Sequence, residues 1–127
     1  MRAAIIGSGG IGAALTEALL QRTELQKLYC FSRTAKPWLD TRVEVAALDI
    51  GDEASIAGAA AQVDQPLDLV IIATGTLHGN QGDVAYKPEK ALSQLNSEVM
   101  TTLFAVNTVG PALVLRYFAN KMRRDSS

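Results

Sequence analysis

Residues 7–12 read Gly7-Ser8-Gly9-Gly10-Ile11-Gly12 and fit the spacing G-x-G-x-x-G. The aliphatic run Arg2 to Ile6 precedes them, and from Ile11 to Gln21 apolar residues recur at the spacing of one helix face. Glycine tolerates a tight turn and lets the main chain approach a diphosphate, while the amino end of a helix offers unpaired N–H groups and the positive end of its dipole. The pattern therefore predicts a strand, a turn and a helix that bind the pyrophosphate of a dinucleotide. The alternative is a glycine-rich turn without a ligand.

Short aliphatic runs alternate with segments of helical spacing along the rest of the chain. Further strands are predicted at Lys27 to Ser32, Val43 to Ala47 and Leu67 to Ala73, and further helices at Glu53 to Val63, capped by Asp52, and at about Ser97 to Met122. Residues 69–72 are apolar throughout, which is typical of a strand buried on both faces. The alternation predicts an α/β fold, a Rossmann-type parallel sheet with strand order 3-2-1-4 and helices on both faces. The glycine-rich residues 74–88 are expected to form a loop at the carboxyl end of the fourth strand, where open parallel sheets bind ligands.

Composition and charge exclude several classes of protein. The 127 residues, of which 48% are apolar and 20% charged, are expected to form one globular domain. A net charge of -1 without a basic block disfavours nucleic acid as a partner. The single cysteine, Cys30, can form neither an internal disulfide nor a cysteine-based zinc site, and the lone His78 has no metal-binding companion, so we expect no metal and a cytoplasmic, reducing location. Glycines and Glu17 interrupt the apolar start of the chain, so neither a signal peptide nor a membrane span is expected.

The end of the second predicted strand bears on which dinucleotide binds. A carboxylate there would accept hydrogen bonds from the ribose of NAD, whereas an arginine would pair with the 2′-phosphate of NADP. The chain has Ser32-Arg33-Thr34 at this point and no acid between Lys27 and Pro37. We therefore expect NADP(H), with Arg33 as the charge partner and Ser32 or Thr34 as hydroxyl donors. NAD is the alternative cofactor, and a solvated surface side chain is the alternative role for Arg33.

Two further segments are candidate walls of the cofactor site. Asp49 could accept a hydrogen bond from the adenine amino group while Ile50 borders the ring. Aspartate also commonly forms turns by bonding nearby backbone N–H groups, so a turn is an equal alternative for Asp49. After the fourth strand, Ala73-Thr74-Gly75 supplies small residues that leave space for a ribose.

Together, five segments of the chain resemble the short-chain dehydrogenases/reductases, and among them the small bacterial C-factor-like branch. The segments are Ile5 to Gly12, Phe31-Ser32-Arg33, Leu48-Asp49-Ile50, Ile71 to Gly75, and Phe104-Ala105-Val106-Asn107 followed by Gly110-Pro111. The resemblance implies that the glycine turn binds the pyrophosphate, Asp49 the adenine and residues 73–75 the ribose on the nicotinamide side. It also implies that Asn107 belongs to an Asn-Ser-Tyr-Lys catalytic tetrad.

Asn107 also stands out on physical grounds. An amide in an otherwise apolar helical stripe is costly unless its polar atoms find partners. Pro111, four residues later, has no N–H to donate, so the Asn107 carbonyl loses its helical partner and the helix is expected to kink. In the family this carbonyl holds a water of the proton relay. The alternative for Asn107 is a structural role within a kinked helix.

The sequence departs from the family pattern in two respects. The family's first two glycines are usually separated by three residues, whereas two separate Gly7 from Gly10, and Ile6 stands where threonine is expected. The family's catalytic serine and Tyr-x-x-x-Lys pair are expected beyond the long helix, and so beyond the last residue of this sequence. Tyr117 and Lys121 satisfy the same spacing but lie on the predicted helix of Asn107, so we expect a packing role for Tyr117.

The sequence thus predicts a single NAD(P)-binding domain over residues 1–127, incomplete at its carboxyl end and inactive by itself. The whole enzyme is expected to transfer hydride between NADP(H) and a small-molecule carbonyl or alcohol substrate. A free edge on the fourth strand favours pairing with another segment, so a homo-oligomer is expected. A non-catalytic dinucleotide sensor or interaction module is the alternative function. A methyltransferase is disfavoured because no acid ends the second strand.

Overall fold

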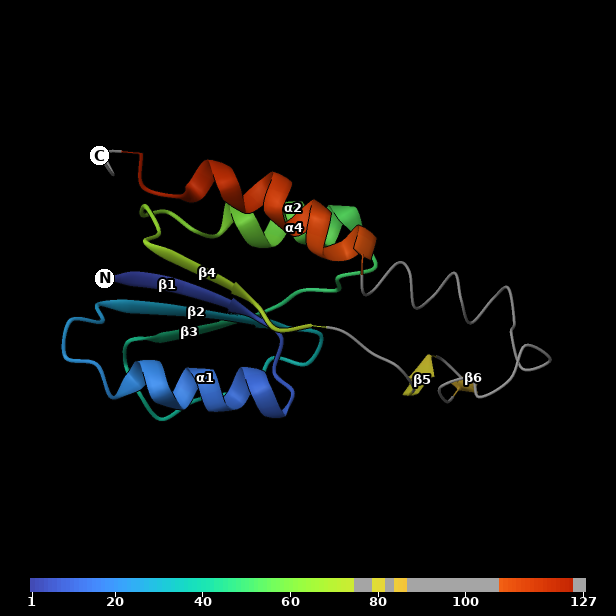
Figure 1. Cartoon of the computed structure of the whole chain (residues 1–127), viewed down its shortest axis with the longest axis horizontal. Coiled ribbons are helices and arrows are strands. Elements are labelled where there is room, and N and C mark those ends of the chain that lie inside the picture. Colours follow the sequence, from blue (N-terminus) through green and yellow to red (C-terminus); the bar gives the residue numbers. More distant parts are fainter. Residues whose placement is uncertain (75–78, 82–83, 87–107, 125–127) are drawn as a thin grey trace.

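The computed structural model describes residues 1–74, 79–81, 84–86 and 108–124 (Figure 1). Its elements, in chain order, are β1 (Arg2–Ile6), α1 (Gly10–Leu20), β2 (Lys27–Ser32), β3 (Val43–Ala47), α2 (Glu53–Ala61), β4 (Leu69–Ile72), β5 (Gly79–Gln81), β6 (Val84–Tyr86), α4 (Gly110–Phe118) and a 3₁₀ helix, η3 (Ala119–Lys121). The first three strands begin and end at the residues predicted for them, and α1 and α2 lie close to their predicted bounds.

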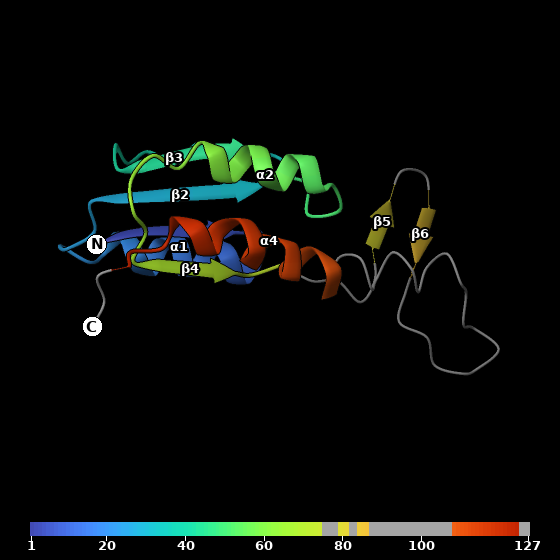
Figure 2. The same cartoon turned by 90° about the horizontal axis from the view of Figure 1, so that it is seen from above.

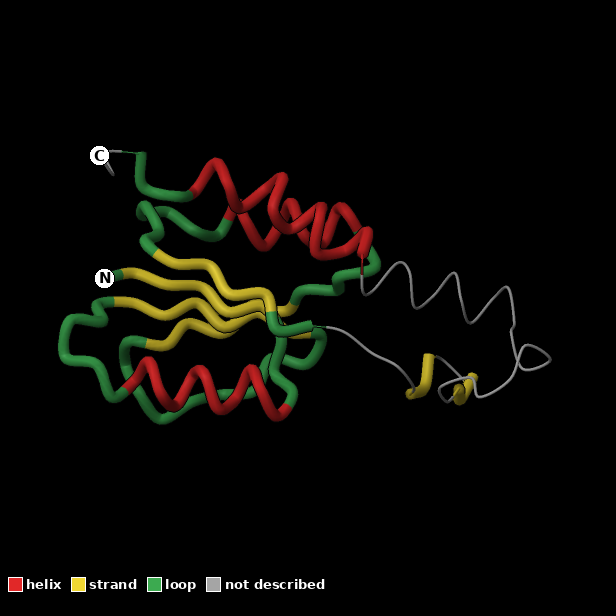
Figure 3. Tube along the Cα trace, in the orientation of Figure 1, coloured by secondary structure: helices red, strands yellow, loops and turns green. Residues whose placement is uncertain are grey.

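The four longer strands form one parallel sheet of order β3-β2-β1-β4. All four strands point in the same direction (Figure 1), and the connecting loops leave from their carboxyl ends (Figure 3). α1 covers one face of the sheet, and α2 and α4 lie together on the other (Figures 1 and 2). The predicted strand order and the placing of helices on both faces are therefore confirmed.

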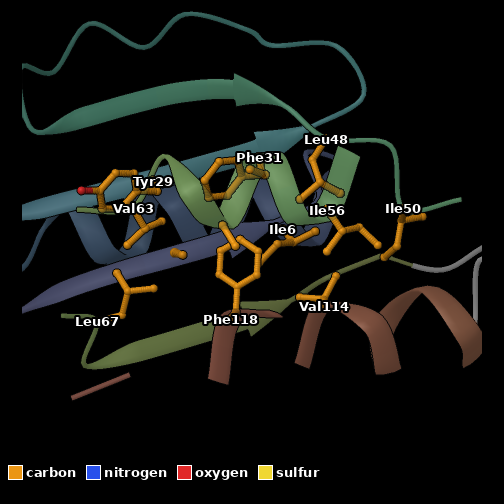
Figure 4. Close-up of a cluster of buried hydrophobic side chains, with 13 residues drawn as sticks. Ile6, Tyr29, Phe31, Leu48, Ile50, Ile56, Val63, Leu67, Val114 and Phe118 are labelled. Carbon is orange, nitrogen blue, oxygen red and sulfur yellow. The ribbon is translucent and has the colours of Figure 1, made fainter. Parts of the chain in front are cut away.

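The face beneath α2 and α4 carries the larger part of the core. Phe31 of β2 and Phe118 of α4 are almost fully buried and pack edge to face, with ring centroids 5.5 Å apart. Ile56 of α2 and Ile6 of β1 belong to the same cluster (Figure 4). Full burial of one such side chain contributes roughly 1.5–3 kcal/mol of transfer free energy, so this cluster is what holds α4 on the sheet.

The opposite face is covered by α1 and by the connection from β2 to β3. Its smaller core consists of Ala3, Ile5, Leu19, Leu25 and Leu28. Residues 33–42 cross from β2 to β3 without forming a helix. Arg42 fastens the end of this connection to α1, because its guanidinium donates to the Leu20 carbonyl at 2.8 Å and to the Arg22 carbonyl at 3.2 Å.

β4 lies at the edge of the described sheet, and its four residues are all half-buried. The expectation of burial on both faces is thus met only in part, because an edge strand has fewer neighbours than a central one. After α4 the chain returns to the start of this strand. The Leu67 N–H donates to the Lys121 carbonyl and the Arg123 N–H donates to the Leu67 carbonyl, each at 2.8 Å. Leu67 and Met122 form a parallel bridge, so the edge expected to be free has a partner at this end.

The expectation of a loop over residues 74–88 is wrong in part. Within that range β5 and β6 form an antiparallel pair, because the strand preferences of residues such as Val84 and Tyr86 outweigh the glycines and polar residues on which the expectation rested. The helix predicted over residues 97–122 is described only from Thr108 onward. Pro111 lies in the first turn of α4, where its missing N–H costs little. None of the described helices is long and apolar enough to cross a membrane.

Replacing Phe118 by alanine should lower the free energy of unfolding by about 3–5 kcal/mol, because it removes a fully buried ring from the contact with Phe31. Leu115→Ala is the control, since Leu115 lies on the same helix but is 59% exposed. Its expected effect is within about 0.5 kcal/mol. Urea denaturation followed by circular dichroism measures both, and equal losses would contradict the packing of α4 described above.

Candidate cofactor-binding site

The predicted glycine turn lies where β1 passes into α1. Gly7 has a φ of 117°, a backbone conformation that residues with side chains rarely adopt. A Cβ atom on Gly7 would also lie 2.5 Å from the carbonyl oxygen of Ala73. The Gly7 N–H donates to the Phe31 carbonyl at 2.7 Å, which holds the turn against the neighbouring strand. The predicted strand, turn and helix are therefore present. Glycine is required at position 7 both by its backbone conformation and by the close approach of Ala73.

Gly12 brings α1 against this turn. A Cβ atom on Gly12 would lie 2.2 Å from the carbonyl oxygen of Gly7, so any other residue would push the helix away. Gly9 and Gly10 differ, because they are exposed and a Cβ atom on either would meet nothing within 4 Å. The turn thus has a closed inner side at Gly7 and Gly12 and an open outer side at Gly9 and Gly10.

The open side is the amino end of α1. The first helical bond runs from the Ala13 N–H to the Gly9 carbonyl at 2.8 Å, and no side chain caps the helix. The N–H groups of residues 9–12 therefore have no partner within the helix. The first turn, which is described in full, carries no acidic side chain. Free donors, open space and the positive end of the helix dipole suit a diphosphate at this point.

The end of β2 presents the three residues expected to contact the 2′-phosphate. Ser32 is half-buried, and its hydroxyl donates to the Thr34 carbonyl at 2.7 Å. Arg33 is exposed and makes no ion pair with the described residues. Its guanidinium is therefore accessible to a ligand, and its pairing with a phosphate stays a prediction.

Asp49 forms the turn that leads into α2. Its Oδ1 accepts from the Gly51 N–H at 2.9 Å, and its own N–H donates to the Ser55 hydroxyl at 2.8 Å. The turn that the sequence allowed is therefore present, while the contact with adenine stays a prediction. Ile50, also expected to border the ring, is 8% exposed and belongs to the core beneath α2 and α4.

The segment after β4 approaches the turn from the other side. Ala73 continues the strand, since its N–H donates to the Ile6 carbonyl at 2.8 Å. The Thr74 hydroxyl is buried and has no hydrogen-bond partner among the described residues, which is unusual for a buried polar group and leaves it free for a ligand. Gly75 and Asn107 lie outside the described residues, so the roles expected for them stay predictions.

A cleft of about 290 Å³ opens beside the turn. Gly7, Ser8 and Ser32, which the sequence placed in the site, line it together with Lys36 and Trp38 from the connection between β2 and β3. Sequence reasoning missed these last two residues. An aromatic residue close to a lysine in the connection between two predicted strands is the signal that could have drawn attention to them.

Tyr117 joins the two helices on the other face of the sheet. Its hydroxyl donates to Glu53 Oε2 at 2.6 Å, and Arg116 Nη1 lies 3.3 Å from the same oxygen. The hydrogen bond to Glu53 raises the pKa of the Tyr117 phenol above its ordinary value. The Tyr117 hydroxyl thus links α4 to α2 on the face of the sheet opposite α1, which is a structural role.

Gly12→Ala should lower the free energy of unfolding by about 1–3 kcal/mol, because the new methyl group would collide with the Gly7 carbonyl. Gly10→Ala is the matched control on the open side of the turn. It should leave stability unchanged or raise it by up to about 1 kcal/mol, since alanine favours helix more than glycine does. Thermal unfolding measures both variants, and similar melting temperatures for the two would contradict the close approach of α1 to the turn.

The structure is similar to solved structures of short-chain dehydrogenases. NADPH-bound carbonyl reductase from chicken fatty liver matches with a TM-score of 0.78 and 20% identity, over 94% of this chain and 50% of the reductase. A short chain dehydrogenase from Burkholderia cenocepacia in complex with NADP matches with a TM-score of 0.77 and 25% identity, over 94% and 47% of the two chains. A short chain dehydrogenase family protein from Francisella tularensis subsp. tularensis has a TM-score of 0.77 and 15% identity, over 96% and 46%.

No family model and no curated protein sequence matches the chain. The chain spans about half the length of the solved structures described above. Within that half, its parallel sheet and covering helices have the fold of those proteins.

Proposed function

We propose that this chain is the cofactor-binding part of an NADP(H)-dependent oxidoreductase of the short-chain dehydrogenase/reductase type. The whole enzyme would transfer hydride between the cofactor and a small-molecule carbonyl or alcohol substrate. The glycine turn carries the proposal. Gly7 and Gly12 leave no room for a Cβ atom, while the uncapped amino end of α1 offers free N–H groups to a diphosphate.

The register of the sheet supports a dinucleotide rather than a lone phosphate. Ile6, the last residue of β1, pairs with Phe31 on one side and with Ile72 on the other. The glycine turn is therefore flanked by the end of β2 and by the end of β4. A dinucleotide whose pyrophosphate lies on the turn can extend one nucleoside in each direction, as ligands do where the strand order of an open sheet reverses.

The side chains at the two flanks support an assignment of the two nucleosides. Arg33 follows β2, and no acid lies between Lys27 and Pro37 to favour a bare ribose, so the adenosine 2′-phosphate belongs on this side. The Thr74 hydroxyl, which is buried and has no hydrogen-bond partner in the part of the chain that the structure describes, follows β4, where the nicotinamide ribose would lie. Two of the matched proteins, the chicken reductase and the Burkholderia dehydrogenase, are described as holding NADPH and NADP, which agrees with this choice.

The bound nicotinamide would supply or accept the hydride, and the residues of this chain would bind and orient it. The turn and the end of β2 fix the cofactor at its diphosphate and 2′-phosphate. Asn107 is the candidate that the family resemblance offers for the proton relay. Within the proposal the chain alone binds cofactor without turning over substrate, and it works as a homo-oligomer in the cytoplasm.

Calorimetric titration should show tighter binding of NADPH than of NADH, by about tenfold or more, because charge-assisted hydrogen bonds contribute about 1.5–3 kcal/mol. Arg33→Glu should remove that preference. Arg124→Glu is the charge-matched control, since Arg124 is exposed and follows the pairing of Arg123 with Leu67 at the opposite end of the sheet. Equal affinities for the two cofactors would contradict the role of Arg33, and binding of neither would contradict the proposed function.

A further inference from the structure

A second cavity lies at the amino-terminal ends of the strands, at the opposite end of the sheet from the glycine turn (Figure 1). Its volume is about 530 Å³. Two segments far apart in the sequence form its walls, residues 63–66, which precede β4, and residues 120–124, which follow α4. The candidate cofactor-binding site uses none of these residues, so the second cavity is a separate feature of the molecule.

Hydrogen bonds within the protein hold the two walls of the second cavity in place. The Leu67 N–H donates to the Lys121 carbonyl, and the Arg123 N–H donates to the Leu67 carbonyl, each at 2.8 Å. On the other wall, the buried Tyr29 donates its hydroxyl hydrogen to Asp64 Oδ1 at 3.1 Å. The walls are therefore positioned before any ligand arrives, which lowers the entropy cost of binding.

Cations outnumber acids in the lining of the second cavity. Its charged residues are Asp64, Lys121, Arg123 and Arg124. Arg123 is compensated, because its Nε donates to Asp68 Oδ1 at 2.6 Å and lowers the pKa of that carboxyl. Lys121 and Arg124 form no ion pair within the described part of the chain. The cavity thus has an excess of positive charge, although the net charge of the whole chain is -1.

The end of α4 accounts for only part of this charge. A cation in the last turn of a helix faces the negative end of the helix dipole, and this effect falls off within that turn. η3 follows α4 directly and ends at Lys121, so Lys121 can act in this way, whereas Arg124 lies beyond both helices. A bound anion would account for both cations.

The other polar groups of the second cavity restrict the kind of anion. Gln65 Oε1 accepts from Arg2 Nη2 at 3.3 Å, which leaves the amide nitrogen of Gln65 to donate to a ligand. Asp64 Oδ1 accepts from Tyr29, while Oδ2 has no hydrogen-bond partner among the described residues. An ionised carboxylate can only accept, so a ligand beside Asp64 needs a donor such as a hydroxyl group. The ligand that fits therefore combines an anionic group with hydroxyl groups.

The size and lining of the second cavity indicate a small molecule. Its volume falls within the roughly 300–1,000 Å³ typical of small-molecule sites and exceeds what a bare phosphate ion needs. The described residues that line it include no aromatic ring on which a nucleic-acid base could stack. Two uncompensated cations suit a phosphate ester, because its phosphoryl group carries a charge of about -1.5 to -2 at neutral pH.

We propose that the second cavity binds a small phosphate ester that carries hydroxyl groups, which is the chemistry of a sugar phosphate. Lys121 and Arg124 bind the phosphate, and Asp64 accepts a hydrogen bond from a hydroxyl group. The inference goes beyond the proposed function, because it requires neither the glycine turn nor a dinucleotide.

Ribose 5-phosphate is the probe for this site. When it is added to the isotopically labelled chain, the backbone amide signals of residues 64–65 and 120–124 should shift in a saturable way. Inorganic phosphate, which lacks the sugar, should bind about tenfold more weakly because it cannot use Asp64. Ribose, which lacks the phosphate, should cause no saturable shift.

Three variants test the assigned residues. The double variant Lys121→Ala/Arg124→Ala should weaken ribose 5-phosphate about tenfold or more, because it removes both charged donors. Asp64→Asn should remove the preference for ribose 5-phosphate over inorganic phosphate without weakening inorganic phosphate. Arg116→Ala is the matched control, since Arg116 is an exposed cation of α4 that pairs with Glu53 and does not line the cavity. It should change the affinity for ribose 5-phosphate less than about twofold.

Circular dichroism of each variant shows whether it is folded, and the amide shifts of the unaltered chain test the proposal without any variant. Signals of residues 64–65 and 120–124 that do not move would overturn the proposal, as would a folded double variant that binds ribose 5-phosphate as tightly as the unaltered chain. Equal affinities of the unaltered chain for ribose 5-phosphate and inorganic phosphate would show a site for any anion and would also overturn it. Shifts confined to residues 8–12 would place the phosphate at the glycine turn, with the same consequence.

Discussion

The close approach of α1 to the end of β1 is the constraint on which the rest of the structure depends. Gly12 lies so near the Gly7 carbonyl that a single methyl group would separate them, and a Cβ atom on Gly7 would lie 2.5 Å from the carbonyl oxygen of Ala73, which follows the neighbouring strand. Three backbone segments meet at this point without a side chain between them. Their meeting places the uncapped amino end of α1 beside the carboxyl ends of β1, β2 and β4.

The two faces of the sheet differ in how completely the helices and loops cover them. On one face, α2 and α4 are held by buried aromatic and aliphatic residues and by the bond from Tyr117 to Glu53, which makes this side a packed support. On the other face, α1 and the loop from β2 to β3 cover the strands less completely and leave a cleft next to the glycine turn. The absence of a helix from residues 33–42 is therefore a feature of the candidate site, because it exposes the strand surface that a ring could contact.

Local sequence signals predicted most of the described fold. The bounds of β1, β2 and β3 could be predicted because each is a short, mostly apolar run that is followed within two residues by glycine or a charged residue, and the glycine spacing marked the start of α1. The pairing of Leu67 with Met122 could not be predicted, since it joins residues far apart in the chain through a single bridge. Lys36 and Trp38 were missed for the same reason. Only the path of their loop across the α1 face brings them to Gly7 and Ser32. Asp49 shows the intermediate case, in which the sequence allowed two roles and the structure shows the turn.

The central claim is that the N–H groups at the start of α1 bind a diphosphate, and backbone amide NMR tests it most directly. On addition of NADPH to the isotopically labelled chain, the amide signals of Ser8 to Gly12 should shift most, because a diphosphate would accept hydrogen bonds from these groups. Amides of α2 and α4, on the opposite face, should shift little. Saturable shifts that leave residues 8–12 unchanged would show that the cofactor binds elsewhere and would contradict this account of the turn.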